Sequence, residues 1–71
     1  MIPLTLVSNG SAVRIMRIGG SAKVKGHLED IGFVSGSEIS VVSSLGGNVI
    51  VDIKGSRIAL GSDMASRIMV V

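Results

Sequence analysis

The 71-residue chain lacks cysteine, tryptophan and tyrosine, and it contains a single phenylalanine, a single proline and a single histidine. Without cysteine no disulfide can cross-link the chain, so its stability has to come from one small apolar core. No apolar run reaches the roughly 18 residues that a membrane helix needs, and no basic region precedes an apolar stretch at the start. The sequence therefore predicts one soluble domain, residues 1–71, located in the cytoplasm and not inserted in a membrane.

The scarcity of aromatic residues excludes two kinds of binding module. Proteins that bind single-stranded nucleic acid stack the bases on aromatic side chains, and proline-rich peptides dock in grooves lined with aromatics. The formal net charge is only +2, which attracts a phosphate backbone weakly. We therefore expect no nucleic-acid partner and no recognition of proline-rich peptides.

Residues for catalysis and metal binding are scarce as well. The single histidine and the five scattered carboxylates do not lie at a known spacing from any side chain that could act as a nucleophile activated by a general base. The glycine pairs are not followed by Lys-Ser or Lys-Thr, so they form no phosphate-binding loop. His27 and Asp30 are weak metal-ligand candidates on one face of a helix, but a stable centre needs at least three protein ligands. The sequence predicts a protein that is not an enzyme and holds no cofactor.

Short segments of alternating apolar residues, separated by ten glycines, make up most of the chain. Strands are expected at residues 12–18, 38–43, 48–53, 57–60 and 67–71. Gly46-Gly47 and Lys54-Gly55 suit the tight turns of two hairpins. A flat sheet of such strands would leave free edges, which closure removes. The expected fold is all-β with one short helix, a small SH3-like, partly open β-barrel of about five antiparallel strands.

One helix is predicted in the middle of the chain. Ser21 can cap its first turn, and Val24, Leu28 and Ile31 then form an apolar stripe at helical spacing. Gly32 suits the left-handed residue that ends such a helix. We expect the helix to run to about residue 31 and to pack its stripe against the sheet.

The segments near the two ends carry weaker signals. Residues 3–7 are apolar and are expected to be extended or to form a single turn, and residues 8–11 form a turn cluster. Ser62 or Asp63 can cap one helical turn through residues 64–65 before the last strand.

The chain has more apolar residues than so small a body can bury. Hydrophobic residues make up 46% of it, and the mean hydropathy is +0.66. Scattered exposed valines and isoleucines are common, whereas a cluster of them marks an interaction surface. Strand alternation places four of six candidate contact residues on the face opposite the core as apolar anchors, and the other two are nearby arginines that act as steering charges. These six are Arg14, Met16, Arg17, Val42, Ile50 and Met69.

The order of motifs resembles a known family. The helix end reads Leu28-Glu29-Asp30-Ile31-Gly32-Phe33, Ser35-Gly36 follows it, and Ile58-Ala59-Leu60 forms a later strand. This pattern is similar to that of FeoA, the small SH3-like component of bacterial ferrous-iron uptake, over nearly the whole chain. The resemblance implies a cytosolic accessory to FeoB, the membrane permease whose amino-terminal domain binds GTP. Self-association is left open, and the rim at Gly46-Gly47-Asn48 and Gly61 departs from the family pattern.

A second class of protein shares the same motifs. The carboxy-terminal domains of metal-dependent repressors of the diphtheria-toxin-repressor type are similar in fold, which implies an effector-binding or dimerising domain as the alternative. A free-standing chain of this length is expected to lack the DNA-reading helices of such a repressor. The transport accessory is therefore the favoured interpretation.

Overall fold

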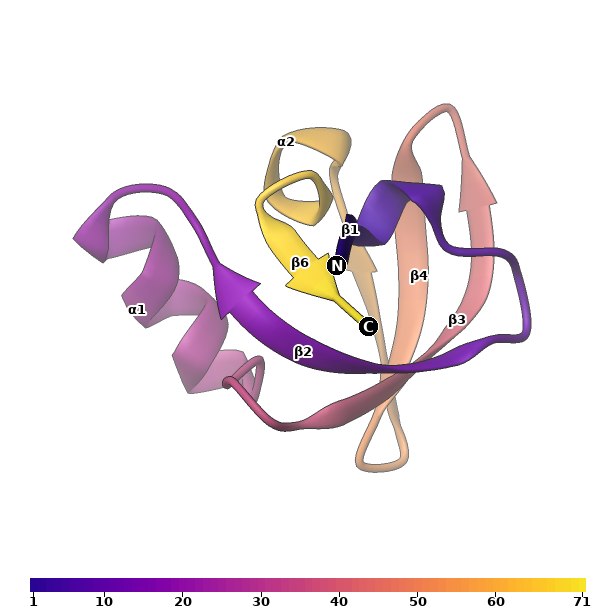
Figure 1. The fold of residues 1–71 in the computed structure, drawn as a ribbon, viewed down its shortest axis with the longest axis horizontal. Helices are drawn as coiled ribbons and strands as arrows, with labels where there is room; N and C mark the ends of the chain where they lie inside the picture. The colour runs from indigo at the N-terminus through magenta and orange to yellow at the C-terminus, as the bar shows by residue number, and fades with distance from the viewer.

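A six-stranded antiparallel sheet runs through the computed structural model, which describes all of residues 1–71 (Figure 1). The strands are β1 (Ile2–Pro3), β2 (Ala12–Ile18), β3 (Glu38–Leu45), β4 (Asn48–Ile53), β5 (Ser56–Leu60) and β6 (Ile68–Val70). Their order in the sheet is β1-β6-β2-β3-β4-β5, so β1 and β5 are its edges. The helical elements are the 3₁₀ turn η1 (Leu4–Leu6) and the α-helices α1 (Ala22–Ile31) and α2 (Ser62–Ala65).

The predicted SH3-like fold is confirmed, and the sheet has six strands where about five were expected. The sixth strand is β1, in which Ile2 lies opposite Val70 and Pro3 lies opposite Met69. A strand of two residues is too short to show alternation, so no pattern separates it from the turn that follows. The expectation for residues 3–7 was an extended segment or a single turn, and both occur there in succession.

Strand β2 connects the two halves of the sheet because it pairs with β3 near its start and with β6 near its end. Its register shifts between Ile15 and Arg17, which makes Met16 the extra residue of a β-bulge. As a result Ile15 and Ile18 are both buried, although strict alternation would place Ile18 on the outer face with Met16. A second register shift, in β3 between Val41 and Ser43, makes Val42 the extra residue of another β-bulge.

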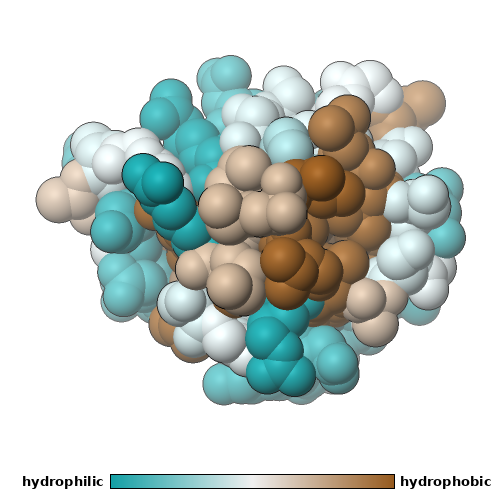
Figure 2. Space-filling model, in the orientation of Figure 1, coloured by the Kyte–Doolittle hydropathy of each residue, from teal (hydrophilic) through white to brown (hydrophobic).

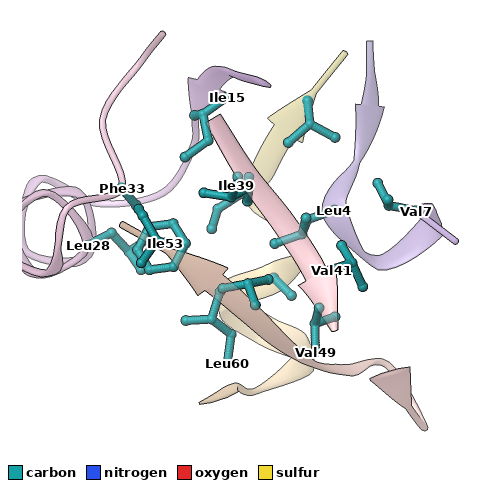
Figure 3. Packing of buried hydrophobic residues seen from close by; sticks show 14 of the residues in the cluster. Leu4, Val7, Ile15, Leu28, Phe33, Ile39, Val41, Val49, Ile53 and Leu60 are labelled. Atoms are coloured by element: carbon teal, nitrogen blue, oxygen red, sulfur yellow. The ribbon is translucent and has the colours of Figure 1, made fainter. Parts of the chain in front are cut away.

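The core contains fifteen buried side chains, and all of them are hydrophobic. Figure 3 shows Leu28 and Phe33, at the end of α1, together with core residues of the strands. Phe33, the one aromatic residue, has no exposed surface. The residues expected to point inward from the later strands are buried, namely Ile39, Val41, Val49, Val51, Ile53 and Leu60, while Ile58 is half-buried against the core.

Both predicted hairpin turns are present. Gly46 and Gly47 have φ of 59° and 85°, and Lys54 and Gly55 have φ of 52° and 83°. Two consecutive left-handed residues form the turn whose twist matches that of antiparallel strands. In the second turn the N–H of Gly55 donates to Oδ1 of Asp52 at 3.1 Å. Lys54 is the one residue other than glycine that has a positive φ.

Helix α1 begins and ends as the sequence predicts. The hydroxyl of Ser21 accepts from the N–H of Val24 at 3.3 Å. Gly32 has φ of 116°, and the N–H of Phe33 donates to the carbonyl of Leu28 at 2.9 Å. This left-handed end turns the chain back toward the sheet and brings Phe33 into the core.

The predicted cap of α2 is wrong. Gly61 occupies the N-cap position, and no side chain caps this turn. The reason lies in a contact from another strand: the N–H of Ser62 donates to Oδ1 of Asn48 at 3.0 Å. Asn48 therefore ties the first hairpin turn to the start of α2, and neither Ser62 nor Asp63 is needed as a cap.

Candidate functional site

A hollow of about 420 Å³ lies between the second half of β2, α1 and the loop after α1. In Figure 1, α1 lies beside the end of β2. We call this hollow the β2 groove. Its walls are formed by Met16, Arg17, Ile18, Gly19, Gly20, Lys25, Glu29, Val34 and Ser35. Two of the six expected contact residues, Met16 and Arg17, therefore belong to it.

The change of pairing partners along β2 leaves one side of its last residues open to the groove. Pairing with β3 ends at Arg14, opposite Glu38, whereas pairing with β6 continues to Ile18. Beyond Arg14, the loop after α1 replaces β3 for a short distance, since Ser35 Oγ donates to the carbonyl of Met16 at 2.9 Å. The last residues of β2 therefore have a neighbouring strand on one side and the groove on the other.

Apolar surface is exposed at two walls of the groove. Met16 is 47% exposed on the strand, and Val34 is 38% exposed on the loop. The main chain beside both side chains is fixed by hydrogen bonds: Ser35 Oγ donates to the Met16 carbonyl, and the N–H of Gly36 donates to the carbonyl of Ile15 at 2.7 Å. A fixed backbone lets such side chains receive a partner at a small cost in conformational entropy.

Positive charge surrounds the groove. Arg67 Nη1 lies 3.1 Å from the position that a Cβ on Gly20 would occupy, so its guanidinium lies against one end. Beside the loop wall, Arg14 Nη1 donates to the carbonyl of Gly36 at 3.3 Å. Glu29 is the one acidic side chain in the lining, and Glu38 is paired opposite Arg14. Four of the seven Lys and Arg residues lie here: Arg14, Arg17, Lys25 and Arg67.

Met69 joins this region from β6. Its Cα is paired with that of Arg17 on one side and with that of Pro3 on the other, and its side chain is half-buried. The structure therefore brings four of the six expected contact residues together around β2 and β6, namely Arg14, Met16, Arg17 and Met69.

The other two expected contact residues, Val42 and Ile50, lie apart from the groove. The N–H of Val41 donates to the carbonyl of Ser11, at the start of β2, so Val42 lies near the opposite end of that strand from Met16. Ser11 and Met16 are five positions apart along extended chain, or roughly 16 Å at 3.3 Å per residue. Ile50 is 39% exposed and borders a second, smaller hollow of about 230 Å³ on β3, β4 and β5.

A third apolar area lies around the two ends of the chain. Figure 2 shows hydrophobic side chains gathered over β1, η1 and the carboxy-terminal end. The exposed large apolar residues of these segments are Met1, Ile2, Leu6 and Val71. The sequence pattern did not indicate this area, because its residues are far apart along the chain and meet only through the pairing of β1 with β6.

His27 and Asp30 are both exposed on α1. No group of three or more His, Asp or Glu side chains is arranged to hold a metal ion. Neither helix combines the length and the apolar character required to cross a lipid bilayer.

The sequence pattern missed the wall of the groove that faces β2. Lys25, Glu29, Val34 and Ser35 belong to α1 and the loop after it, and nothing in their spacing places them opposite Met16. The available signal was the run of basic residues between positions 14 and 25, which surrounds the Gly19-Gly20 turn.

Comparison with known proteins gives consistent matches over the whole chain. A family model described as FeoA domain matches residues 2–71. A protein of Methanocaldococcus jannaschii, whose name assigns it to Fe(2+) transport as transport protein A, is 34% identical over 70 residues. That alignment covers 99% of this chain and 85% of the relative.

Solved structures agree with these sequence matches. The crystal structure of an iron uptake regulatory protein (FeoA) superposes with a TM-score of 0.89 at 30% identity and covers 99% of this chain and 93% of the other. The solution structure of iron(II) transport protein A from Clostridium thermocellum has a TM-score of 0.89 at 30% identity, over 97% of this chain and 44% of the other. A manganese-dependent transcriptional repressor reaches 0.88 at 25% identity, over 97% of this chain but 40% of the repressor.

The family model, the sequence relative and the solved FeoA structure all match at least 97% of the residues described above. The solved FeoA structure also has the same fold, with a TM-score of 0.89. The chain therefore belongs to the FeoA family, the non-enzymatic accessory proteins of ferrous-iron transport.

Proposed function

We propose that this chain is a cytosolic accessory protein that binds the cytoplasmic GTP-binding region of a FeoB-type permease, and that the β2 groove and its surroundings form the contact. Membership of the FeoA family supports the link to ferrous-iron transport. The observation that carries the proposed contact is the coincidence, at one concave site, of exposed apolar side chains with positive charge.

The groove combines the two properties of a specific protein contact. Met16 and Val34 expose apolar surface that a bound partner would remove from contact with water. Such burial stabilises a complex by about 25 cal/mol per Å² of buried area, before the costs of association are subtracted. Arg17 and Lys25 make no side-chain hydrogen bond within the chain, so they are available to attract an oppositely charged surface. Charges of this kind raise the rate of association more than the final affinity.

The experiment is a binding measurement with the purified GTP-binding region of the permease, with and without guanine nucleotide. Met16→Glu places a charge in the groove, and Ile50→Glu makes the same change on another strand at a similar exposure, 39% against 47%. We expect Met16→Glu to weaken binding more than tenfold and Ile50→Glu to leave it within about threefold. Circular dichroism checks that both variants remain folded.

The pair of variants also tests the other group of expected contact residues. If Ile50→Glu abolishes binding and Met16→Glu does not, the contact lies over β3 and β4, around Val42 and Ile50. If neither variant matters, the apolar area around the chain ends is the next surface to test, with Leu6→Glu as the corresponding change.

The likeness to a manganese-dependent repressor supports a second candidate function, that of an effector-binding or dimerising domain. This second function predicts the opposite result in the binding measurement. The chain would then fail to bind the permease region at any nucleotide state and would instead form a dimer, which light scattering after size-exclusion chromatography measures directly.

A further inference from the structure

We infer that the partner binds the β2 groove by adding an extended segment to the free edge of β2 as a further strand. In this arrangement an apolar side chain of the segment lies against Met16 and Val34, and a carboxylate lies between Arg17 and Lys25. The inference rests on the proposed function and specifies the part of the partner that the groove receives: an extended, acidic segment.

The backbone of β2 provides the first step. The N–H of Gly19 donates to the carbonyl of Arg67 at 2.7 Å, toward β6. Successive residues of a strand direct their N–H and C=O groups to opposite edges, so those of Ile18 point away from β6. No strand pairs with Ile18 on that side, because pairing with β3 ends at Arg14, and no backbone hydrogen bond outside the ladders involves it. Ile18 is 9% exposed and lines the groove, and its unpaired N–H and C=O belong to the edge of β2 that adjoins it.

The other edges of the sheet are less suited to such pairing. Strand β1 has two residues, and one of them, Pro3, has no N–H to donate. Strand β5 has a free edge of five residues, from Ser56 to Leu60, but its end lines the smaller hollow, whose lining carries no charged side chain. The free part of β2 is the edge that adjoins a groove with both apolar and charged walls. In strand addition the backbone supplies the affinity and such walls supply the specificity.

The side chains of the walls select the sign of the incoming charge. Two cations, Arg17 and Lys25, and one carboxylate, Glu29, line the groove. Arg67 and Arg14 lie beside it, and Glu38 is paired opposite Arg14. Arg17 comes from the strand and Lys25 from the helix, so they approach the groove from opposite walls. A carboxylate between them gains two charge-assisted contacts, whereas a basic segment is repelled from both sides. The preferred segment is therefore acidic, with an apolar residue nearby.

Amide hydrogen exchange measures strand addition directly. The test uses the ¹⁵N-labelled full chain, alone and bound to the purified GTP-binding region of the permease. In the free chain the Ile18 amide has no acceptor and exchanges rapidly, and we expect the complex to slow it at least tenfold. The Gly19 amide is the internal control, since it is bonded to Arg67 in both states and changes little.

A pair of charge reversals on α1 tests the acidic character of the segment. Lys25→Glu alters a wall of the groove, and Lys23→Glu makes the same change two residues earlier, outside it. We expect Lys25→Glu to weaken binding at least tenfold and Lys23→Glu less than twofold. Equal effects of the two would overturn the pairing of a carboxylate with Lys25.

The outcomes separate the inference from the proposed function. A complex that forms while Ile18 stays unprotected overturns strand addition and leaves the permease as the partner. Protection that appears instead at Arg57 or Ala59, on the free edge of β5, also overturns it. If the unaltered chain does not bind the permease region at all, the proposed function fails, and the inference fails with it.

Discussion

The replacement of Phe33 with Ala is the most informative change to the core. Phe33 has no exposed surface, and it follows directly on the left-handed residue Gly32, so its position is fixed by the end of α1. Truncating a buried phenylalanine costs about 3 to 5 kcal/mol, because both the transfer energy and the packing around the cavity are lost. A domain of this length has a total unfolding free energy of about 4 to 11 kcal/mol. The variant is therefore expected to be only marginally folded.

The assay is urea unfolding followed by far-ultraviolet circular dichroism, because the chain has no tryptophan or tyrosine to report by fluorescence. With a slope of about 1 kcal/mol per M, the midpoint for Phe33→Ala falls by about 3 M or more. Val34→Ala is the matched control: the neighbouring side chain is 38% exposed, so its loss is expected to cost less than about 1 kcal/mol.

A decrease in the free energy of unfolding of less than about 1 kcal/mol for Phe33→Ala would refute the placement of this ring at the centre of the core. If that variant does not fold at all, Phe33→Leu keeps the site apolar and is expected to cost about 1 to 2 kcal/mol. A loss with Val34→Ala as large as that with Phe33→Ala would have the same meaning.

The same unfolding assay tests three backbone features. Gly26→Ala is expected to stabilise the chain by about 0.5 to 1 kcal/mol, since Gly26 is inside α1 with open space around it, whereas Gly32→Ala costs about 1 to 2 kcal/mol at φ of 116°. Lys54 and Gly55 both have left-handed backbone conformations. Asparagine adopts this conformation more readily than lysine, so Lys54→Asn is expected to raise the free energy of unfolding by up to about 1 kcal/mol. Alanine adopts it less readily than glycine, so Gly55→Ala is expected to lower the free energy of unfolding by about 1 to 2 kcal/mol. Ser21→Ala removes the hydroxyl that caps α1 and is expected to cost about 1 kcal/mol. Effects of the opposite sign would contradict the conformations described here.

Local signals explain why much of the fold could be predicted from the sequence. The ends of α1 depend on Ser21 and Gly32, and the hairpin turns depend on glycines at left-handed positions, so each is encoded within a few residues. The bulges at Met16 and Val42 depend on how distant strands pair, and alternation within one strand cannot reveal them. This is why the sequence pattern predicted a single contact surface, whereas the structure holds the six residues in two groups.

The candidate site could be predicted only in part for the same reason. Met16 was identified because outward positions on a strand follow from its alternation, and Arg17 was added as a charge beside it. Their facing wall belongs to α1 and the loop after it, and its position depends on the angle at which α1 leaves the sheet. Residues such as Lys25 and Val34 are ordinary surface positions in the sequence, and only the fold brings them opposite β2.

The free edge of β2 is also a risk, because unpaired strand edges promote aggregation. Three features of this chain limit that risk. The open part is short, ending at Gly19-Gly20, and Ser35 already binds the carbonyl of Met16. Moreover, two copies that paired through this edge would bring their cations together, Arg17 and Lys25 among them, and like charges at close range destabilise such a contact. The charge that would attract an acidic segment thus also disfavours self-association through the groove, so that one surface feature serves both recognition and solubility.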